Sequence, residues 1–378
     1  MIHIDTGALK AALNTLKSYV TTKGTLSAIL SSVLVEYSDS QGLRISATDL
    51  SQSACLDVEC IADAPLGEIA FCVEHKTLSS LINRLKGERV TLHYDSDALS
   101  IRCGRVAVEL PTLNAQEFPE LPQTDATMSP LLIAPLLTAL EAVSPFASTD
   151  EARPNLNSVL LEGREHGVAR LVATDGYTIA VVDVDCGVDQ PFSERLVPRD
   201  AVGALVKALK SAQRDGASSV EVLIGEGMIH IKSGLLRSSI RLLAERYVPY
   251  EGVIPTEHGS AAVIDVRELA DEVSTVASLD SDSLGRVRFT AEGDQLLIES
   301  DVEKGRVTSA VTIEPVSGEL PSLALSSTYA ARALKSASMI SERAELAANV
   351  STSPIVLTPT ALADKVVSAR FVVVPMRS

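Results

Sequence analysis

An internal repeat constrains the fold of this chain more than any other feature of its sequence. The stretches "LSSVLVEYSDSQGLRISATDL", "LNSVLLEGREHGVARLVATDG" and "LGRVRFTAEGDQLLIESDV" share one pattern. Val33, Val159 and Val287 occupy its equivalent position, 126 and 128 residues apart, and three such periods fill the 378 residues. Self-similarity at a fixed spacing is typical of repeated structural modules. The sequence therefore predicts three domains of one design.

Each copy predicts the same order of elements. A first amphipathic helix is expected in each copy, over 9–20, 135–147 and 267–278. In the first of these, Leu9, Leu13 and Leu16 follow the spacing of one buried helical face. Two alternating stretches then predict a hairpin with one covered face. A second helix follows, over 76–86, 199–210 and 328–339, and the first two copies continue with more hairpin pattern. The fold class is α+β, with two helices on one face of an antiparallel sheet in each domain.

Two turn-rich segments mark the ends of the first and second copies. They are "FPELP" at 118–122 and "VPYEGVIP" at 248–255. Because Pro and Gly favour turns and linkers, we expect domain boundaries near residues 125 and 257. The predicted domains are 1–125, 126–257 and 258–378.

Composition excludes several classes of protein. No run of about eighteen apolar residues is present, and the N-terminus lacks the pattern of an export signal, so we expect a cytoplasmic protein without membrane contact. The five cysteines form no CxxC pair, which favours free thiols. The six histidines are scattered, so neither a metal nor another cofactor is expected.

The net charge of the chain is negative, but its predicted second helices are positively charged. The formal net charge is −16, yet the second helices of the three copies carry +3, +2 and +2. All six helical stretches together carry +6, which leaves −22 for the rest of the chain. The Debye length at cellular salt is about 8 Å, so a phosphate held against these helices would feel their charge and little of the outer acidity. Alternatively, these cations are only a solvated surface.

The chain ends on "RFVVVPMRS", an apolar run that stops close to the terminus. Frayed termini are usually polar, so this run predicts either the last strand of a sheet or a surface that another molecule occupies.

Several motifs, in order and spaced by the repeat, identify a family. They are "TLSAIL" (25–30), "ATDL" (47–50), "EFPELP" (117–122), "RPNLNSVLLE" (153–162), "LVATDGYTIA" (171–180), "YVPYEGVIP" (247–255) and "VVVPMRS" (372–378). With them the chain resembles, over its whole length, the bacterial DNA polymerase III β subunit, the sliding clamp that acts as processivity factor in DNA replication.

The resemblance implies a ring-shaped homodimer that joins head to tail and encircles duplex DNA without reading its sequence. A closed ring that encloses DNA stays on it with few contacts and without any chemical step, so no enzyme activity is expected. The cations expected to touch phosphates are Lys23, Lys76, Arg84, Arg153, Arg199, Lys207, Lys210, Arg332 and Lys335.

The resemblance also implies a groove between the second and third domains. Short peptides of DNA polymerase, clamp loader and repair proteins would bind there, which would explain the apolar end of the chain. From the second domain the expected groove residues are Leu156, Thr174, Gly176, Tyr177, Thr178, Ile179, Val248 and Val253. From the third they are Tyr329, Pro354, Val372, Val373, Val374, Pro375, Met376 and Arg377, with Val372 to Val374 expected in a strand.

The chain departs from the family pattern at a few positions. Thr178 and Gly252 stand where Arg is common, Val374 where Met is usual, Ser378 where Leu is usual, and Asp200 where Lys is frequent. These changes leave open a divergent second-copy or mobile-element clamp, with an altered groove that is insensitive to groove-binding inhibitors.

Two other classes of function remain as alternatives. A hydrolase could use Asp49 or Asp175, but an Asp that satisfies the amides of a turn is the simpler interpretation of "ATDG", since the motif occurs twice. A repeat protein that only scaffolds other proteins is the remaining alternative.

Overall fold

The computed structural model describes residues 1–21, 28–95, 97–278, 285–302 and 305–376. The chain forms two compact units. Unit 1 comprises Met1–Ser129 and Gly203–Arg241, and unit 2 comprises Pro130–Val202 and Leu242–Ser378. Each unit is described on its own below.

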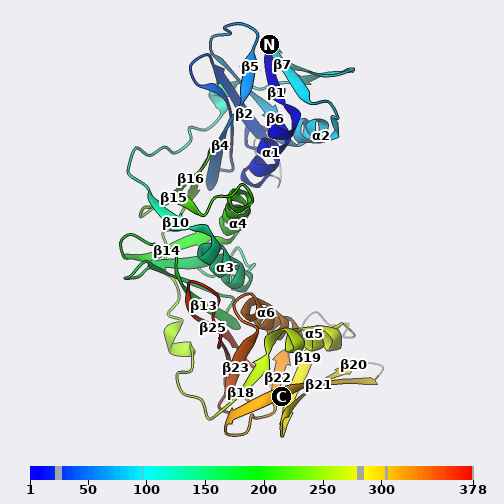
Figure 1. The fold of residues 1–378 in the computed structure, drawn as a ribbon, viewed down its shortest axis with the longest axis vertical. Coiled ribbons are helices and arrows are strands. Elements are labelled where there is room, and N and C mark those ends of the chain that lie inside the picture. The colour runs from blue at the N-terminus through cyan, green and yellow to red at the C-terminus, as the bar shows by residue number, and fades with distance from the viewer. Residues whose placement is uncertain (22–27, 96, 279–284, 303–304, 377–378) are drawn as a thin grey trace. The chain divides into compact units, whose positions relative to one another are not determined.

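Every repeat follows one order: a strand, a helix, several strands, a second helix and three more strands (Figure 1). The first repeat contains β1 (Ile2–Asp5), α1 (Thr6–Leu16), β2 (Ser32–Ser38), β3 (Gly42–Thr48), β4 (Gln52–Val58), β5 (Cys60–Ala62), β6 (Ile69–Glu74), α2 (His75–Arg84), β7 (Arg89–Asp95), β8 (Ala98–Cys103) and β9 (Val106–Pro111). The second contains β10 (Ser129–Leu132), α3 (Ile133–Val143), β11 (Ser158–Gly163), β12 (Val168–Thr174), β13 (Thr178–Asp185), β14 (Phe192–Pro198), α4 (Arg199–Arg214), β15 (Ser219–Ile224), β16 (Met228–Ser233) and β17 (Leu236–Arg241). The third contains β18 (Ser260–Asp265), α5 (Val266–Ala277), β19 (Arg286–Glu292), β20 (Gln295–Val302), β21 (Gly305–Ser317), β22 (Leu323–Ser326), α6 (Ser327–Ser338), β23 (Arg343–Ala348), β24 (Ile355–Pro359) and β25 (Val366–Val373). Short 3-10 turns are η1 (Lys17–Tyr19), η2 (Ala28–Ser31), η3 (Ala115–Glu117), η4 (Ser144–Phe146) and η5 (Glu251–Val253).

The repeat predicted from the sequence is confirmed at the level of single residues. Val33, Val159 and Val287 are each the second residue of a strand, and all three are buried. The six predicted helices exist, with shifted ends. The first helix begins at Thr6 rather than residue 9, because Asp5 Oδ1 accepts a hydrogen bond from the Ala8 amide at 2.8 Å and caps the helix there.

The sequence missed several strands. Each repeat opens with a short strand before its first helix, and the third repeat, like the others, ends with three strands after its second helix. The helix predicted over 199–210 continues to Arg214. The strand expected through Val374 ends at Val373.

In each unit, one sheet joins strands of two successive repeats. In unit 1 the order β15-β16-β17-β4-β3-β2-β6 joins the last strand of the second repeat to the first repeat, while β5-β1-β7-β8-β9 forms another sheet. In unit 2 the order β14-β11-β12-β13-β25-β24-β23-β18-β21-β20-β19-β22 joins the last strand of the third repeat to the second. The strand pairs that make these joins are β17 with β4 and β25 with β13.

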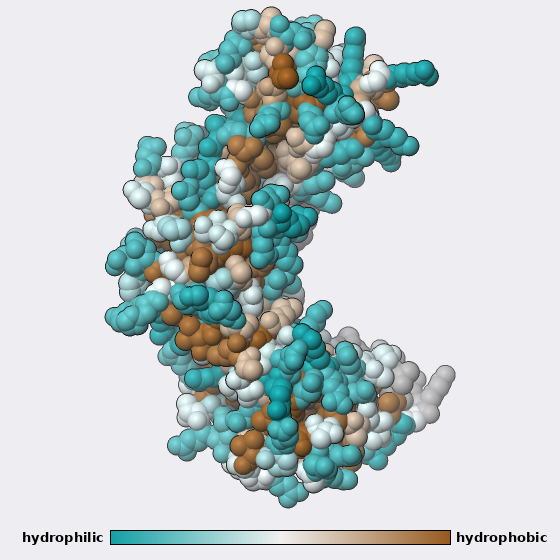
Figure 2. Space-filling view, viewed as in Figure 1, coloured by the Kyte–Doolittle hydropathy of each residue, from teal (hydrophilic) through white to brown (hydrophobic). Residues whose placement is uncertain are grey.

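Helices cover one face of these sheets. In unit 1, Leu13 of α1, Leu78 of α2 and Ala204 of α4 lie in one buried cluster with Val33 and Ile45 of the sheet. In unit 2, α5 and α6 lie side by side (Figure 1). No helix within the described residues has the length and apolar character needed to cross a membrane. The view in Figure 2 shows a mainly hydrophilic surface with smaller hydrophobic areas.

The five cysteines are free thiols, as expected. Cys72, Cys103 and Cys186 are buried, and Cys55 and Cys60 are half-buried. Burial raises the pKa of Cys72 and of Cys186 to about 12, so both thiols stay protonated at neutral pH.

Candidate functional site

The turn that joins β12 to β13 is built by two side chains of the "ATDG" motif. Asp175 Oδ1 accepts hydrogen bonds from the amides of Tyr177 and Thr178, at 2.9 and 2.8 Å. Thr174 Oγ1 donates to the carbonyl of Thr178 at 2.7 Å and accepts from the amide of Gly176 at 3.1 Å. Gly176 adopts a φ of +94°, which a side chain would disfavour. The prediction that this Asp satisfies turn amides is confirmed.

The first repeat builds the same turn. Asp49 Oδ1 accepts from the amides of Ser51 and Gln52, and Thr48 Oγ1 donates to the carbonyl of Gln52. Leu50 takes the place of the glycine, with a φ of +76°. Two copies of one arrangement indicate a structural motif of the repeat.

The second carboxylate oxygen of Asp175 binds a cation from the third repeat. Arg332 Nη1 of α6 lies 2.6 Å from Asp175 Oδ2 and donates to Thr178 Oγ1 at 3.1 Å. The Arg332 side chain is 23% exposed and that of Asp175 is 14% exposed, so water screens this pair only partly. Arg332, predicted as a phosphate contact, therefore has its charge paired beside the predicted groove.

An aromatic stack extends from this ion pair to the surface. The Arg332 guanidinium lies 5.8 Å from the ring centre of Phe146 and 5.2 Å from that of Tyr329. Tyr329 in turn stacks on Tyr177, with 5.8 Å between ring centres, and Tyr177 is 57% exposed. Such cation–aromatic contacts hold the guanidinium in place in addition to its ion pair.

The C-terminal residues are fixed beside this turn. Val373 pairs with Thr178 in the sheet, and the amide of Val374 donates to the carbonyl of Tyr177 at 3.0 Å. The amide of Met376 donates to the carbonyl of Ala324 at 2.7 Å. Val374, Pro375 and Met376 are half-buried, so they present part of their surface to solvent.

Alternate residues of the last strand point to opposite sides of the sheet. Phe371 packs against Phe146 with 5.7 Å between ring centres, whereas Val372 belongs to a cluster with Ile179 and Val248. The terminal run is therefore the last strand of the sheet and is largely buried, and its part in a peptide groove stays a prediction.

The sequence missed two large members of this cluster. Tyr247 and Tyr250 of the second linker, residues 247–255, are both buried in it, and burial raises the pKa of each phenol. Both tyrosines stand in the motif "YVPYEGVIP", from which only Val248 and Val253 were predicted as groove residues. Of the other predicted groove residues, Leu156 is buried, Pro354 is half-buried and Val253 is 49% exposed. Arg377 lies outside the described residues.

The predicted phosphate contacts differ in accessibility. Lys76, Arg84, Lys207, Lys210 and Lys335 are exposed side chains of second helices, and Arg199 is half-buried. Arg84 also lines a cavity of 750 Å³ in unit 1, together with Lys10 and Lys86. Arg153 is exposed and pairs with Asp150 at 2.9 Å. Lys23 lies outside the described residues.

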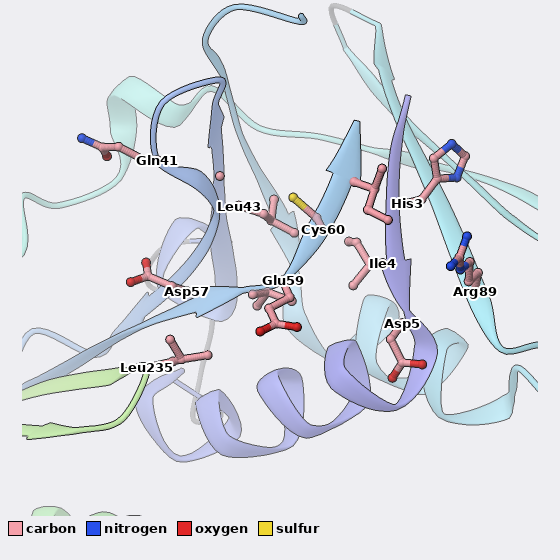
Figure 3. A pocket seen from close by; sticks show the side chains of 13 residues that line it. His3, Ile4, Asp5, Gln41, Leu43, Asp57, Glu59, Cys60, Arg89 and Leu235 are labelled. Carbon is pink, nitrogen blue, oxygen red and sulfur yellow. The ribbon is translucent and has the colours of Figure 1, made fainter. Parts of the chain in front are cut away.

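Unit 1 contains another cavity, of 580 Å³, which no predicted site residue lines. Figure 3 shows His3 and Arg89 on one side of it and Gln41 and Asp57 on the other. The predicted site is therefore elsewhere, at the turn, the last strand and the second linker of unit 2.

Family models match the chain over nearly its whole length. Three family models match in order: the N-terminal, central and C-terminal domains of the DNA polymerase III beta subunit, over residues 1–122, 134–248 and 251–377. The beta sliding clamp of Streptomyces coelicolor is 26% identical over 357 residues, which are 92% of each chain.

Solved structures show the same fold. The DNA polymerase III beta subunit of Thermotoga maritima superposes with a TM-score of 0.88 at 23% identity, covering 100% of this chain and 99% of that one. A sliding clamp of Pseudomonas aeruginosa bound to griselimycin gives a TM-score of 0.86 at 22% identity, with 100% of both chains covered. With all three domain models matched in order along the chain, the chain belongs to the DNA polymerase III beta subunit family, the bacterial sliding clamps.

Proposed function

We propose that this sliding clamp closes as a head-to-tail homodimer around duplex DNA and tethers a DNA polymerase through the groove of unit 2. The proposal includes no catalytic step, no cofactor and a cytoplasmic location, where chromosomal DNA is replicated. We propose domain boundaries near residues 125 and 257; the gap between the family models that end at 122 and begin at 134 supports the first, and the third model begins at 251, shortly before the second.

The observation that carries the dimer is a strand pairing that occurs twice within the chain. The last strand of the second repeat, β17, pairs with β4, and the last strand of the third, β25, pairs with β13. β4, β13 and β21 follow the first hairpin of their repeats. Only one such combination is left, the last strand of the first repeat, β9, with β21 of the third.

Both of these strands offer an edge. β9 ends the sheet order β5-β1-β7-β8-β9. β21 pairs with β20 over residues 305–312 and with β18 over residues 313–317. Within the described residues, the stretch 305–312 therefore has a neighbouring strand on one side and a free edge on the other. Val106 on β9 is 44% exposed. Exposed edges with apolar side chains favour pairing with another chain.

The repeat also gives the register of the proposed pair. Leu236 lies opposite Leu56 in the pair of β17 with β4. By the repeat, Val106 corresponds to Leu236 and Ser309 to Leu56, so Val106 is expected opposite Ser309 of the second copy. Such an interface joins different surfaces of the two subunits, and a ring results when it closes.

A ring that encloses duplex DNA needs only weak, sequence-independent contacts with it. We propose that the exposed cations of the second helices touch phosphates, and that Arg332 instead supports the groove wall. Counterion release by a few Lys and Arg gives affinity without selecting a sequence.

We propose that short peptides of polymerase, clamp loader and repair proteins dock on the accessible residues of the predicted groove, among them Tyr177, Val374 and Met376. An apolar site with Met376 beside it suits several partners. The comparisons give no specific support to a divergent second-copy clamp.

Loading onto plasmid DNA tests the function. With a clamp loader and a nicked circular plasmid, the protein should remain on the circle through gel filtration and be released when the plasmid is cut at one site. A scaffold protein would behave identically on circular and linear DNA, and that outcome would refute tethering.

A further inference from the structure

The start of α1 in unit 1 is tied to the segment that follows α2, and the two helices pack together (Figure 1). The amide of Thr6 donates to the carbonyl of Glu88 at 2.9 Å, and Lys10 Nζ donates to the carbonyl of Leu85 at 2.7 Å. The cavity of 750 Å³ that Arg84 lines lies here, and we call it the α1 cavity. Residues 5–7, Lys10 and residues 83–88 form its lining. Its volume falls within the range of roughly 300–1,000 Å³ that is typical of ligand pockets.

The Thr6 hydroxyl in this lining lacks a hydrogen-bond partner. Thr6 is 4% exposed, and its Oγ1 is buried without a hydrogen bond to any described residue. The helix does not need this hydroxyl as a cap, because Asp5 Oδ1 already accepts the hydrogen bond from the Ala8 amide. A buried hydroxyl without a partner costs free energy, and nearly all such groups in native proteins are hydrogen-bonded. The Thr6 hydroxyl therefore points to a bound molecule that supplies its partner.

The cations of the lining favour an anion. Arg84 and Lys86 are exposed, and neither forms an ion pair within the described residues. Lys10 donates to a carbonyl, which leaves its charge uncompensated. The amide of Gly7 belongs to the first turn of α1, where amides lack a partner within the helix and the helix dipole favours negative charge. All of these groups donate hydrogen bonds, so the ligand has to bring negative charge and acceptors.

Two carboxylates in the lining, those of Asp5 and Glu88, narrow the choice of anion. Asp5 uses Oδ1 to cap the helix, and among the described residues nothing donates to the Glu88 carboxylate. Ionised carboxylates only accept hydrogen bonds, so they disfavour an anion that has no proton to donate, such as sulfate. Inorganic phosphate keeps at least one O–H at neutral pH, whereas the phosphodiesters of DNA keep none. It therefore fits a lining that contains both cations and carboxylates.

We propose that the α1 cavity binds inorganic phosphate. Its oxygens accept hydrogen bonds from the Thr6 hydroxyl and from the cations, and its O–H donates to Glu88. Bound phosphate connects the start of α1 to the end of α2, so it should raise the melting temperature of the protein. The site does not rest on the proposed function, because Arg84 is the one residue that it shares with the cations proposed to touch DNA.

Isothermal titration calorimetry at pH 7 and constant ionic strength measures the binding of sodium phosphate to the full chain. Wild-type protein should bind phosphate saturably and sulfate at least about tenfold more weakly, since sulfate has no proton for the carboxylates. Thr6→Val keeps the shape of the side chain and should weaken phosphate binding about tenfold, because one hydrogen bond to a charged group is lost. Lys86→Gln should weaken it about threefold to tenfold. Arg102→Gln, an exposed change in β8 outside the lining, is the control and should leave binding unchanged.

The stability of Thr6→Val without phosphate gives a second measurement. Because the hydroxyl has no partner in the protein itself, its replacement by a methyl group should leave the melting temperature equal or raise it. A lower melting temperature would indicate that the hydroxyl is bonded within the protein, and it would overturn the proposal. Should Thr6→Val fail to fold, Lys86→Gln alone decides.

Three further outcomes would each overturn the proposal: no saturable binding of phosphate at millimolar concentration, equally tight binding of sulfate, or unchanged binding to both variants. Retention on a nicked circular plasmid separates this site from DNA tethering. Thr6→Val should remain on the circle as wild type does, so failure of the phosphate site and failure of the proposed function give different results.

Discussion

Arg332 on α6 and Asp175 in the turn after β12 form an ion pair with 2.6 Å between Nη1 and Oδ2, and this pair connects the third repeat to the second. The same carboxylate holds the amides of Tyr177 and Thr178 with its other oxygen. One residue of the repeated turn thereby fixes both the turn before β13 and the helix α6.

Replacing Arg332 by Gln should destabilise the protein and weaken the groove. We expect a loss of about 2 kcal/mol, below the roughly 3–5 kcal/mol of fully buried pairs, because this pair is partly exposed. The affinity for a polymerase-derived peptide should fall about tenfold, equivalent to roughly 1.4 kcal/mol. Urea unfolding and peptide titration measure the two effects. Lys335→Gln, an exposed change on the same helix, serves as the control and should alter neither.

The dimer should depend on the free edge of β9. The amide of Thr112 donates to the carbonyl of Asp97 at 3.1 Å, and hydrogen bonding alternates along an antiparallel pair, so the amide of Ala107 should point away from β8. Ala107→Pro removes that donor and should convert the dimer to a monomer in sedimentation at micromolar concentration, whereas Ala107→Ser keeps it. A dimeric proline variant with unchanged stability would contradict the proposed edge.

Phosphate contacts should appear in the salt dependence of DNA binding. Lys76→Ala should reduce the magnitude of the slope of log affinity against log salt by about 1, since one counterion fewer is released. Anisotropy titrations on a short linear duplex at several salt concentrations measure this slope. Arg370→Ala removes an exposed cation of β25, a strand in the sheet, and should leave the slope unchanged.

Acid should destabilise unit 2 through Asp183. Burial raises the pKa of this carboxyl, but hydrogen bonds from Arg170 and Ser368 outweigh it, so the pKa lies below its usual value of 3.8. A depressed pKa means that the unfolded chain takes up the proton first as pH falls. The stabilisation is therefore present above pH 3.8 and is lost as pH drops through the folded-state value.

Asp183→Asn should remove this contribution. Its urea midpoint should fall strongly at pH 7, because the half-buried Arg170 charge keeps only its longer ion pair with Glu251, at 3.9 Å, and the difference from wild type should shrink toward pH 2. Glu314→Gln, which breaks the more exposed pair with Arg343, should cost no more than about 1 kcal/mol at any pH. An Asp183→Asn variant with the acid sensitivity of wild type would contradict this assignment.

The sequence alone determined the features that depend on residues close together in the chain. Val33, Val159 and Val287 could be recognised as strand positions, and the "ATD" turns as structural, because alternation and turn chemistry act over a few residues. The terminal "FVVV" could be recognised as a strand for the same reason.

The tertiary structure decided which distant groups meet. Arg332 looked like a free cation until Asp175, far away in the chain, proved to be its partner, and Tyr247 and Tyr250 looked like linker residues until the sheet below them buried both. The short opening strands and the strands after α6 were missed because pairing across the sheet, rather than local propensity, stabilises them. Ser53 and Ser239, unremarkable in the sequence, lie opposite one another only through the register of β4 with β17, because contact across a sheet is set by long-range pairing that a local pattern does not encode.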